Sequence, residues 1–336
     1  MKRHGLAQID LIVMLFISLA LVTFTLAAVA SLDNADSRSK CAANLRQIWQ
    51  AILLYANDNK GPYPRTVYDS QSADKPTAFS GADAADPFGV GGPNANDVSA
   101  GLYLLLRTED ITSSAFICPA TGKQPFTYGG GAHTALDKAN FPSADSLSYS
   151  YANPYPSQTA LGKGYRLVQG LDPTFAVAAD SNPGSDALTT LTVNMSDTQL
   201  RTGNSLNHSG DGQNVLYGDG HIEFQNSPLC GSHRDNIYTY GDSGVDPDTN
   251  AARPTGGLGV MGSPVGPGDS VLLPVSNVGP IAATPLADAS AVTAPNSLPP
   301  AQETAGAGKL TIAILIFGLI AAAGLVVFLI AKKKKR

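Results

Sequence analysis

Residues 33–62 of the chain, DNADSRSKCAANLRQIWQAILLYANDNKGP, have the residue spacing of an amphipathic helix. Apolar residues recur there at intervals of three and four with polar residues between them, so we expect one face of the helix to pack against a core. The helix is expected to end before Pro62, with Gly61 available for a left-handed cap. The apolar positions are Cys41, Leu45, Ile48, Ile52 and Tyr55.

An uncharged run, residues 11–32, precedes this helix with no helix breaker between them. At about 1.5 Å per residue the run would form a helix of roughly 33 Å, enough for a hydrocarbon core of about 30 Å. We therefore predict one long helix. Its membrane-spanning part would be residues 6–32, and its amphipathic part residues 33–60.

A second uncharged run lies at the other end of the chain, at residues 310–331, and the cations KKKKR follow it directly. Such a pattern predicts a transmembrane helix over residues 309–331 with a basic cytoplasmic tail at residues 332–336. Because basic residues also precede the first run, both termini are expected in the cytoplasm.

Charge is divided unevenly along the 336 residues, whose net charge is −5. Residues 33–308 carry 14 basic and 26 acidic residues, a net charge of −12. Phosphate binding needs a basic face, so we expect no nucleic acid among the partners.

The middle of the chain divides into a domain and a linker. Residues 61–242 are numerous enough for a core of their own, and a helix near residues 97–107 is followed by short strand-like runs, including 115–118. This order predicts an α+β fold with an antiparallel sheet. Residues 243–308 contain ten prolines and are predicted to be a disordered linker.

The first residues, MKRHGLAQIDLIVMLF, resemble the leader of type IV prepilins. In that family a short basic leader ends in glycine, prepilin peptidase cleaves after it, and the new N-terminus is methylated. The resemblance implies a leader at residues 1–5, cleavage between Gly5 and Leu6, and an assembly role for the acid Asp10. The family usually has Phe where Leu6 stands and Glu where Asp10 stands.

Two other fates of the N-terminus remain open. Residues 28–30, AVA, resemble a signal-peptidase site that would leave Ser31 as the first residue, and the chain could also keep Met1. Asp10 has a second interpretation as well, in which it only lies at the membrane interface.

Residues 207–224, NHSGDGQNVLYGDGHIEF, predict a β-hairpin with a tight turn at residues 218–220. They resemble the H-X9-DG element of prepilin-type proteins, whose fixed residues match His208, Asp219 and Gly220, although ten residues separate His208 from Asp219 here. The words NLRQI and LYANDNKG resemble those of planctomycete-type pseudopilin-like proteins. The resemblance implies a pilin-like fold, with the long N-terminal helix packed on the antiparallel sheet.

No metal or cofactor is expected, with one weak alternative. Asp211, Asp219 and His221 could bind Ca²⁺ in a glycine-rich loop, but their spacing fits no zinc or EF-hand pattern and tight turns also require Asp and Gly. The sequence has no nucleophile elbow, P-loop or dinucleotide fingerprint, so we expect no enzyme.

Three cysteines leave two alternatives of equal weight. Cys41 and Cys118 both lie in segments that resemble family words, which favours a disulfide between them if any forms. In the other alternative Cys41, Cys118 and Cys230 are all free thiols.

The expected function is that of a non-enzymatic, pseudopilin-like protein resident in the cell (inner) membrane, with residues 33–308 outside the cytoplasm. Its expected partners are prepilin peptidase and other pilin-like subunits or membrane proteins of a type II secretion or type IV pilus-like assembly. The alternative is a membrane-tethered module that binds a cation, a polysaccharide or an envelope partner.

Overall fold

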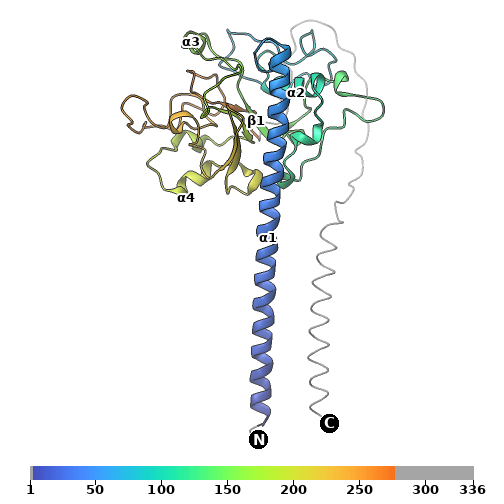
Figure 1. Ribbon diagram of the computed structural model, residues 1–336, viewed down its shortest axis with the longest axis vertical. Coiled ribbons are helices and arrows are strands. Elements are labelled where there is room, and N and C mark those ends of the chain that lie inside the picture. The colour runs from blue at the N-terminus through green and yellow to red at the C-terminus, as the bar shows by residue number, and fades with distance from the viewer. Residues whose placement is uncertain (1–2, 277–336) are drawn as a thin grey trace, which may run out of the picture. The chain divides into compact units, whose positions relative to one another are not determined.

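One long helix and one five-stranded sheet organise the residues that the computed structural model describes, 3–276 (Figure 1). The predicted transmembrane helix at residues 309–331, the basic tail at residues 332–336 and the later part of the predicted linker lie outside the described residues.

The long helix is α1 (Arg3–Asp58), which runs without interruption for 56 residues. Its second half buries the predicted apolar face, and only Tyr55 of that face is partly exposed. The helix ends where Lys60 adopts a φ of 65°, and the Gly61 N–H donates to the carbonyl of Ala56 at 2.7 Å. The buried residues of α1 are Cys41, Leu45, Ile48, Ala51, Ile52 and Ala56.

The first half of α1 presents apolar side chains to its surroundings. Within residues 13–22, large apolar side chains are between 37% and 67% exposed. Among the residues that the structure describes, no helix meets the combined length and hydropathy required of a membrane span. The predicted span at residues 6–32 therefore stays a prediction. The exposed side chains are those of Val13, Met14, Leu15, Phe16, Ile17, Leu19, Leu21 and Val22.

The sheet is antiparallel throughout and has the strand order β4-β3-β2-β1-β5. The predicted α+β class is therefore confirmed. The strand predicted at residues 115–118 is wrong, because residues 113–116 form a 3-10 helix. The strands are β1 (Tyr149–Ala152), β2 (Ala176–Asp180), β3 (Gln213–Tyr217), β4 (Ile222–Gln225) and β5 (Leu272–Leu273).

Helix α2 (Val98–Thr108) packs between α1 and β1 and is buried over most of its length. Asp97 caps it, because its carboxylate accepts from the Ala100 N–H at 2.9 Å. The remaining helices are α3 (Gln158–Gly162), α4 (Asp197–Leu200), and the 3-10 helices η1 (Ser113–Phe116), η2 (Pro119–Thr121), η3 (Ala135–Asp137), η4 (Ala144–Ser146), η5 (Asp186–Thr190), η6 (Arg201–Gly203), η7 (Leu206–His208) and η8 (Ser232–Arg234).

The hairpin of β3 and β4 packs against α1 through its turn. The Gly220 N–H donates to the carbonyl of Tyr217 at 2.9 Å, and Gly220 has a φ of 89°. A Cβ atom at Gly220 would overlap Nε1 of Trp49 on α1. Glycine is therefore required at this position both for its backbone conformation and for the close approach of the helix.

Residues 243–276 belong to the folded domain, so the prediction that a disordered linker begins at residue 243 is wrong. Strand β5 pairs with β1, with Leu273 opposite Tyr151 and Leu272 opposite Ala152. The short apolar run around β5 is buried, which outweighs the proline and glycine content that suggested a linker. The domain predicted to end at residue 242 therefore continues at least to Ser276.

Two buried carboxyl groups lie in this last part of the domain. Asp269 Oδ2 accepts from the N–H groups of Gly241 at 2.9 Å and Val265 at 2.8 Å, and Asp235 Oδ1 accepts from Ser243 Oγ at 2.5 Å. In the described part of the chain, Asp235 Oδ2 and Asp269 Oδ1 have no hydrogen-bond partner. Burial raises the pKa of Asp269 to about 7, and burial with the charge of Asp269 raises the pKa of Asp235.

We expect Gly220→Ala to destabilise the domain by about 2–4 kcal/mol, because strain at positive φ adds to the overlap with Trp49. Gly122→Ala is the matched control, since Gly122 also has a positive φ, 70°, but faces open space and should cost only about 1 kcal/mol. Urea unfolding followed by the fluorescence of Trp49, the single tryptophan, measures both. Equal losses for the two variants would contradict the close approach.

The wild type is expected to lose stability as the pH rises, because Asp269 has to ionise in the core. We expect Asp269→Asn to abolish this pH dependence. A carboxyl whose pKa is raised from 3.8 to about 7 on folding stabilises the fold below pH 4 and loses that contribution as the pH rises to 7. The variant should therefore gain on the order of 2–4 kcal/mol relative to the wild type between pH 4 and pH 8.

Urea unfolding at several pH values measures this effect, with Asp248→Asn at an exposed position as the control. The asparagine oxygen can still accept from Gly241 and Val265, so the local structure is retained. Parallel stability curves for the wild type and Asp269→Asn would refute the prediction.

Candidate functional site

Four elements bring two cysteines, a histidine and a carboxylate together in the core. Cys41 lies on α1, Cys118 directly before η2, Asp180 at the end of β2 and His208 in η7. Their potential ligand atoms all lie within 4.8 Å of one another, and all four residues are buried. Within residues 3–276 this Cys–His–Asp cluster is the one group of three or more such side chains close enough to share an ion.

Cys41 and Cys118 form a disulfide, with their Cα atoms 5.1 Å apart. Of the two alternatives left open by the sequence, the structure contains the bonded one, and Cys230 is a free thiol. The disulfide joins α1 to the segment that leads into the sheet. Asn44 supports the same junction, because its Nδ2 donates to the carbonyl of Ile117 at 2.7 Å and to Tyr149 Oη at 3.2 Å.

His208 lies beside the disulfide and is only 1% exposed. Its Nε2 is 3.7 Å from Cys118 Sγ, 3.3 Å from Asp180 Oδ2 and 3.3 Å from Asn214 Nδ2. Its Nδ1 is buried and has no hydrogen-bond partner among the described residues. The imidazole is therefore oriented through Nε2 and by a T-shaped contact with the ring of Phe224, whose centroid is 5.8 Å away.

Asp180 is fully buried, and three N–H donors surround its carboxylate. Oδ2 accepts from the Asn214 backbone N–H at 2.7 Å and from Asn214 Nδ2 at 3.3 Å, while Oδ1 accepts from Asn207 Nδ2 at 3.0 Å. These donors offset the cost of removing a charge from water. Asp180 was not among the residues predicted for a site, because the residues after it, SNPG, indicate only a turn.

The residues of the predicted H-X-DG element lie in two separate parts of the structure. His208 belongs to the buried cluster, whereas Asp219 and Gly220 form the hairpin turn against Trp49. Asp219 Oδ1 accepts from the His221 backbone N–H at 3.0 Å and lies 2.5 Å from His221 Nδ1. These hydrogen bonds lower the pKa of Asp219, and the one from the His221 backbone N–H has the largest effect. Asp219 thus stabilises the turn and is not part of the cluster that contains His208.

The weak Ca²⁺ alternative at Asp211, Asp219 and His221 is wrong in its geometry. Asp211 pairs with α1 instead, since its Oδ2 is 2.8 Å from Arg38 Nη2 and accepts from Asn34 Nδ2 at 3.2 Å. In the described part of the chain these three residues form no group whose ligand atoms could share an ion.

The residues of the predicted cleavage site lie in the first turns of α1. Helix α1 begins at Arg3 and includes Gly5, Leu6 and Asp10. Their roles in processing and assembly stay predictions.

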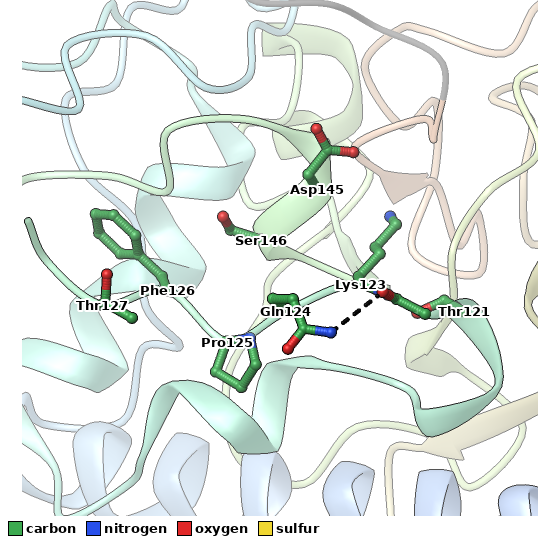
Figure 2. Close-up of a pocket in the computed structure, with 9 residues that line it drawn as sticks. Thr121, Lys123, Gln124, Pro125, Phe126, Thr127, Asp145 and Ser146 are labelled. Atoms are coloured by element: carbon green, nitrogen blue, oxygen red, sulfur yellow. Dashed lines mark hydrogen bonds between the residues drawn. The ribbon is translucent and has the colours of Figure 1, made fainter. Parts of the chain in front are cut away.

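A surface pocket with a volume of about 520 Å³ is lined by residues 121–127 with Asp145 and Ser146 (Figure 2). Its lysine is engaged in holding the loops, because Lys123 Nζ donates to the carbonyls of Ala144 at 2.7 Å and Leu147 at 2.8 Å. Burial lowers the pKa of Lys123. Lys123 therefore has a structural role beside this pocket.

We expect Asp180→Asn to destabilise the domain by about 2–4 kcal/mol, because the new amide group would face N–H donors in place of a carboxylate. Asp219→Asn is the matched control on the exposed turn, and it should change the free energy of unfolding by less than about 1 kcal/mol. Urea unfolding of the oxidised proteins measures both. A tolerated Asp180→Asn would mean that the carboxylate's charge has no structural role.

Comparisons with models of protein families, with curated proteins and with solved structures found no match to the chain. Its function is therefore inferred from its own residues and their geometry.

Proposed function

We propose that the chain is a non-enzymatic, pseudopilin-like membrane protein that takes part in a type II secretion or type IV pilus-like assembly. One observation carries the proposal. Helix α1 is continuous, yet its first half exposes large apolar side chains at residues 13–22 while its second half buries its apolar face against the sheet. In the proposed role the exposed apolar part would serve as an anchor and the buried part would pack on the sheet.

The exposed side chains favour a bilayer over a one-sided partner groove. Residues 13–17 are five consecutive apolar residues, and each is at least 49% exposed. Successive helical residues point about 100° apart, so these five surround the helix. Transfer of each such side chain out of water is worth about 1.5–3 kcal/mol, and a lipid environment provides that on every side.

The N-terminal residues support processing by prepilin peptidase. Gly5 and Leu6 occupy the positions of the cleavage site, and Asp10 follows at the position of the assembly acid. A carboxylate at the mouth of a membrane helix needs a partner, and a neighbouring subunit's free N-terminal amine would provide one. In this proposal Asp10 therefore pairs with the amine of a neighbouring Leu6.

The C-terminal sequence supports a resident of the cell membrane. A second anchor at residues 309–331, followed by five cations, would resist extraction into a fibre. Both termini would then be cytoplasmic and residues 33–308 outside. The partners would be prepilin peptidase and other pilin-like subunits or secretion-system membrane proteins.

A second candidate function rests on charge. Residues 33–308 carry a net charge of −12, which suits a membrane-tethered module that presents an acidic domain to a cation, a polysaccharide or an envelope partner. In that case α1 would serve only as an anchor.

Mass spectrometry of the mature N-terminus tests the proposal in cells that contain prepilin peptidase. We expect N-methyl-Leu6 as the first residue, because cleavage after Gly5 removes residues 1–5. Gly5→Val should block this processing, whereas Ala30→Leu, which disrupts the AVA sequence, should leave it unchanged. A mature protein that begins at Ser31 or retains Met1 would contradict the proposal.

The same membrane preparations separate the two candidate functions. Copurification of other pilin-like subunits with the processed wild type, and its loss in Gly5→Val, is expected for an assembly subunit. An N-methylated protein that copurifies with none of them would favour the tethered module.

A further inference from the structure

The Cys–His–Asp cluster has a donor set that the proposed function does not use. We propose that the chain binds one Zn²⁺ through the four side chains of this cluster when the disulfide is reduced. The disulfide and the metal would then be alternative means of closing the same junction between α1 and the sheet. The inference is independent of the role of the N-terminal half of α1.

Two distances within the cluster match those of a tetrahedral zinc site, and all its ligand atoms lie within 4.8 Å of one another. Bonds of about 2.3 Å to sulfur and 2.0–2.1 Å to nitrogen and oxygen place sulfur about 3.6 Å from nitrogen and nitrogen about 3.3 Å from oxygen. His208 Nε2 is 3.7 Å from Cys118 Sγ and 3.3 Å from Asp180 Oδ2. His208 Nε2 is therefore already as far from Cys118 Sγ and from Asp180 Oδ2 as it would be if all three atoms bound one zinc ion.

The two sulfur atoms have to move apart, because they are bonded to each other in the disulfide. In a tetrahedral site they would lie about 3.8 Å apart, a separation that side-chain rotation supplies once the bond between them is broken. The backbone on both sides is held independently of the disulfide, because Asn44 of α1 donates to the carbonyl of Ile117, directly before Cys118. Reduction therefore leaves the two thiols facing the imidazole and the carboxylate.

Hydrogen-bond donors around the cluster orient the Asp180 carboxylate, as the groups that hydrogen-bond to metal ligands do in zinc sites. Asn207 Nδ2 donates to Asp180 Oδ1, and the Asn214 backbone N–H donates to Oδ2. Oδ2 retains capacity for a further contact, since a carboxylate has about four lone-pair sites.

Charge also favours a divalent cation in the reduced state. Two thiolates and the Asp180 carboxylate would place three negative charges in a site that is at most 1% exposed. Zn²⁺ neutralises two of these charges. Without the metal, the reduced cysteines would have to remain neutral thiols beside the carboxylate.

The reduction and the binding balance as follows. A phosphine reductant breaks the sulfur–sulfur bond, is oxidised to its oxide with an oxygen atom from water, and leaves two thiols. Zn²⁺ then forms two Zn–S bonds and releases the two thiol protons to the buffer. Because the cluster is buried, both reagents reach it when the domain is unfolded, so the metal is added during refolding.

The test uses the full chain in detergent, unfolded with a phosphine reductant and refolded with ZnCl₂ or CoCl₂. After removal of unbound metal, we expect about one zinc per reduced chain and less than about a tenth of that in the oxidised protein. With Co²⁺ we expect thiolate-to-cobalt charge-transfer bands and the visible bands of a tetrahedral site.

Variants assign the ligands. His208→Gln and Asp180→Asn should each weaken zinc binding at least about 10-fold, and Cys41→Ser should also remove part of the thiolate charge-transfer band. Cys230→Ser, at the free cysteine, and His221→Gln, on the exposed turn, are matched controls that should bind like the wild type. Circular dichroism of oxidised His208→Gln and Asp180→Asn separates lost ligation from failure to fold.

Several results would overturn the proposal. Reduced wild-type protein that refolds without retaining zinc, or that fails to refold with it, would do so. Cobalt bound without thiolate bands, equal zinc in the oxidised protein, or loss of zinc in Cys230→Ser would each assign the metal to another place.

Discussion

Attachment of the second half of α1 to the sheet is the interaction on which the rest of the structure depends. The helix buries Cys41, Leu45, Ile48 and Ile52 completely, and this apolar contact joins it to the core. Three polar or covalent contacts then fix its position: the disulfide to Cys118, the Asn44 side chain, and the Arg38–Asp211 ion pair. Because Arg38 also lies over the ring of Phe224, 4.1 Å from its centroid, the helix contacts both ends of the hairpin.

Local signals in the sequence were sufficient for the parts of the fold that local chemistry determines. The periodicity of residues 41–55 identified the packing face of α1, and the glycine-rich turn identified the β3–β4 hairpin. Long-range pairing was not predictable in the same way. Strand β5 is two residues long and is stabilised by pairing with β1, more than a hundred residues earlier, so its own composition indicated a linker. Asp180 was missed for the same reason, since its partners at residues 207 and 214 become neighbours only in the folded chain.

The two proposals use different halves of the same helix. The proposed assembly role depends on the first half, where apolar side chains at residues 13–17 surround α1 and the acid Asp10 follows the proposed processing site. The zinc site depends on the second half, where Cys41 faces the sheet. Neither requires the other, because the buried junction forms within the domain whatever environment surrounds residues 13–22. A rigid junction would nonetheless fix the direction in which the helix leaves the domain.

Two contacts with α1 fix the distance that the chain between His208 and Gly220 has to cover. His208 lies beside Cys118, which is bonded to Cys41, while Gly220 lies against Trp49, eight residues or about 12 Å further along the helix axis. The chain between His208 and Gly220 must span this fixed interval, and a residue gained inside β3 would turn its inward side chains outward. The turn at residues 209–212, where Ser209 and Gly210 have positive φ, lies outside the strand pairing. The helix, not the hairpin, therefore sets the interval that the chain between the histidine and the Asp-Gly pair must span.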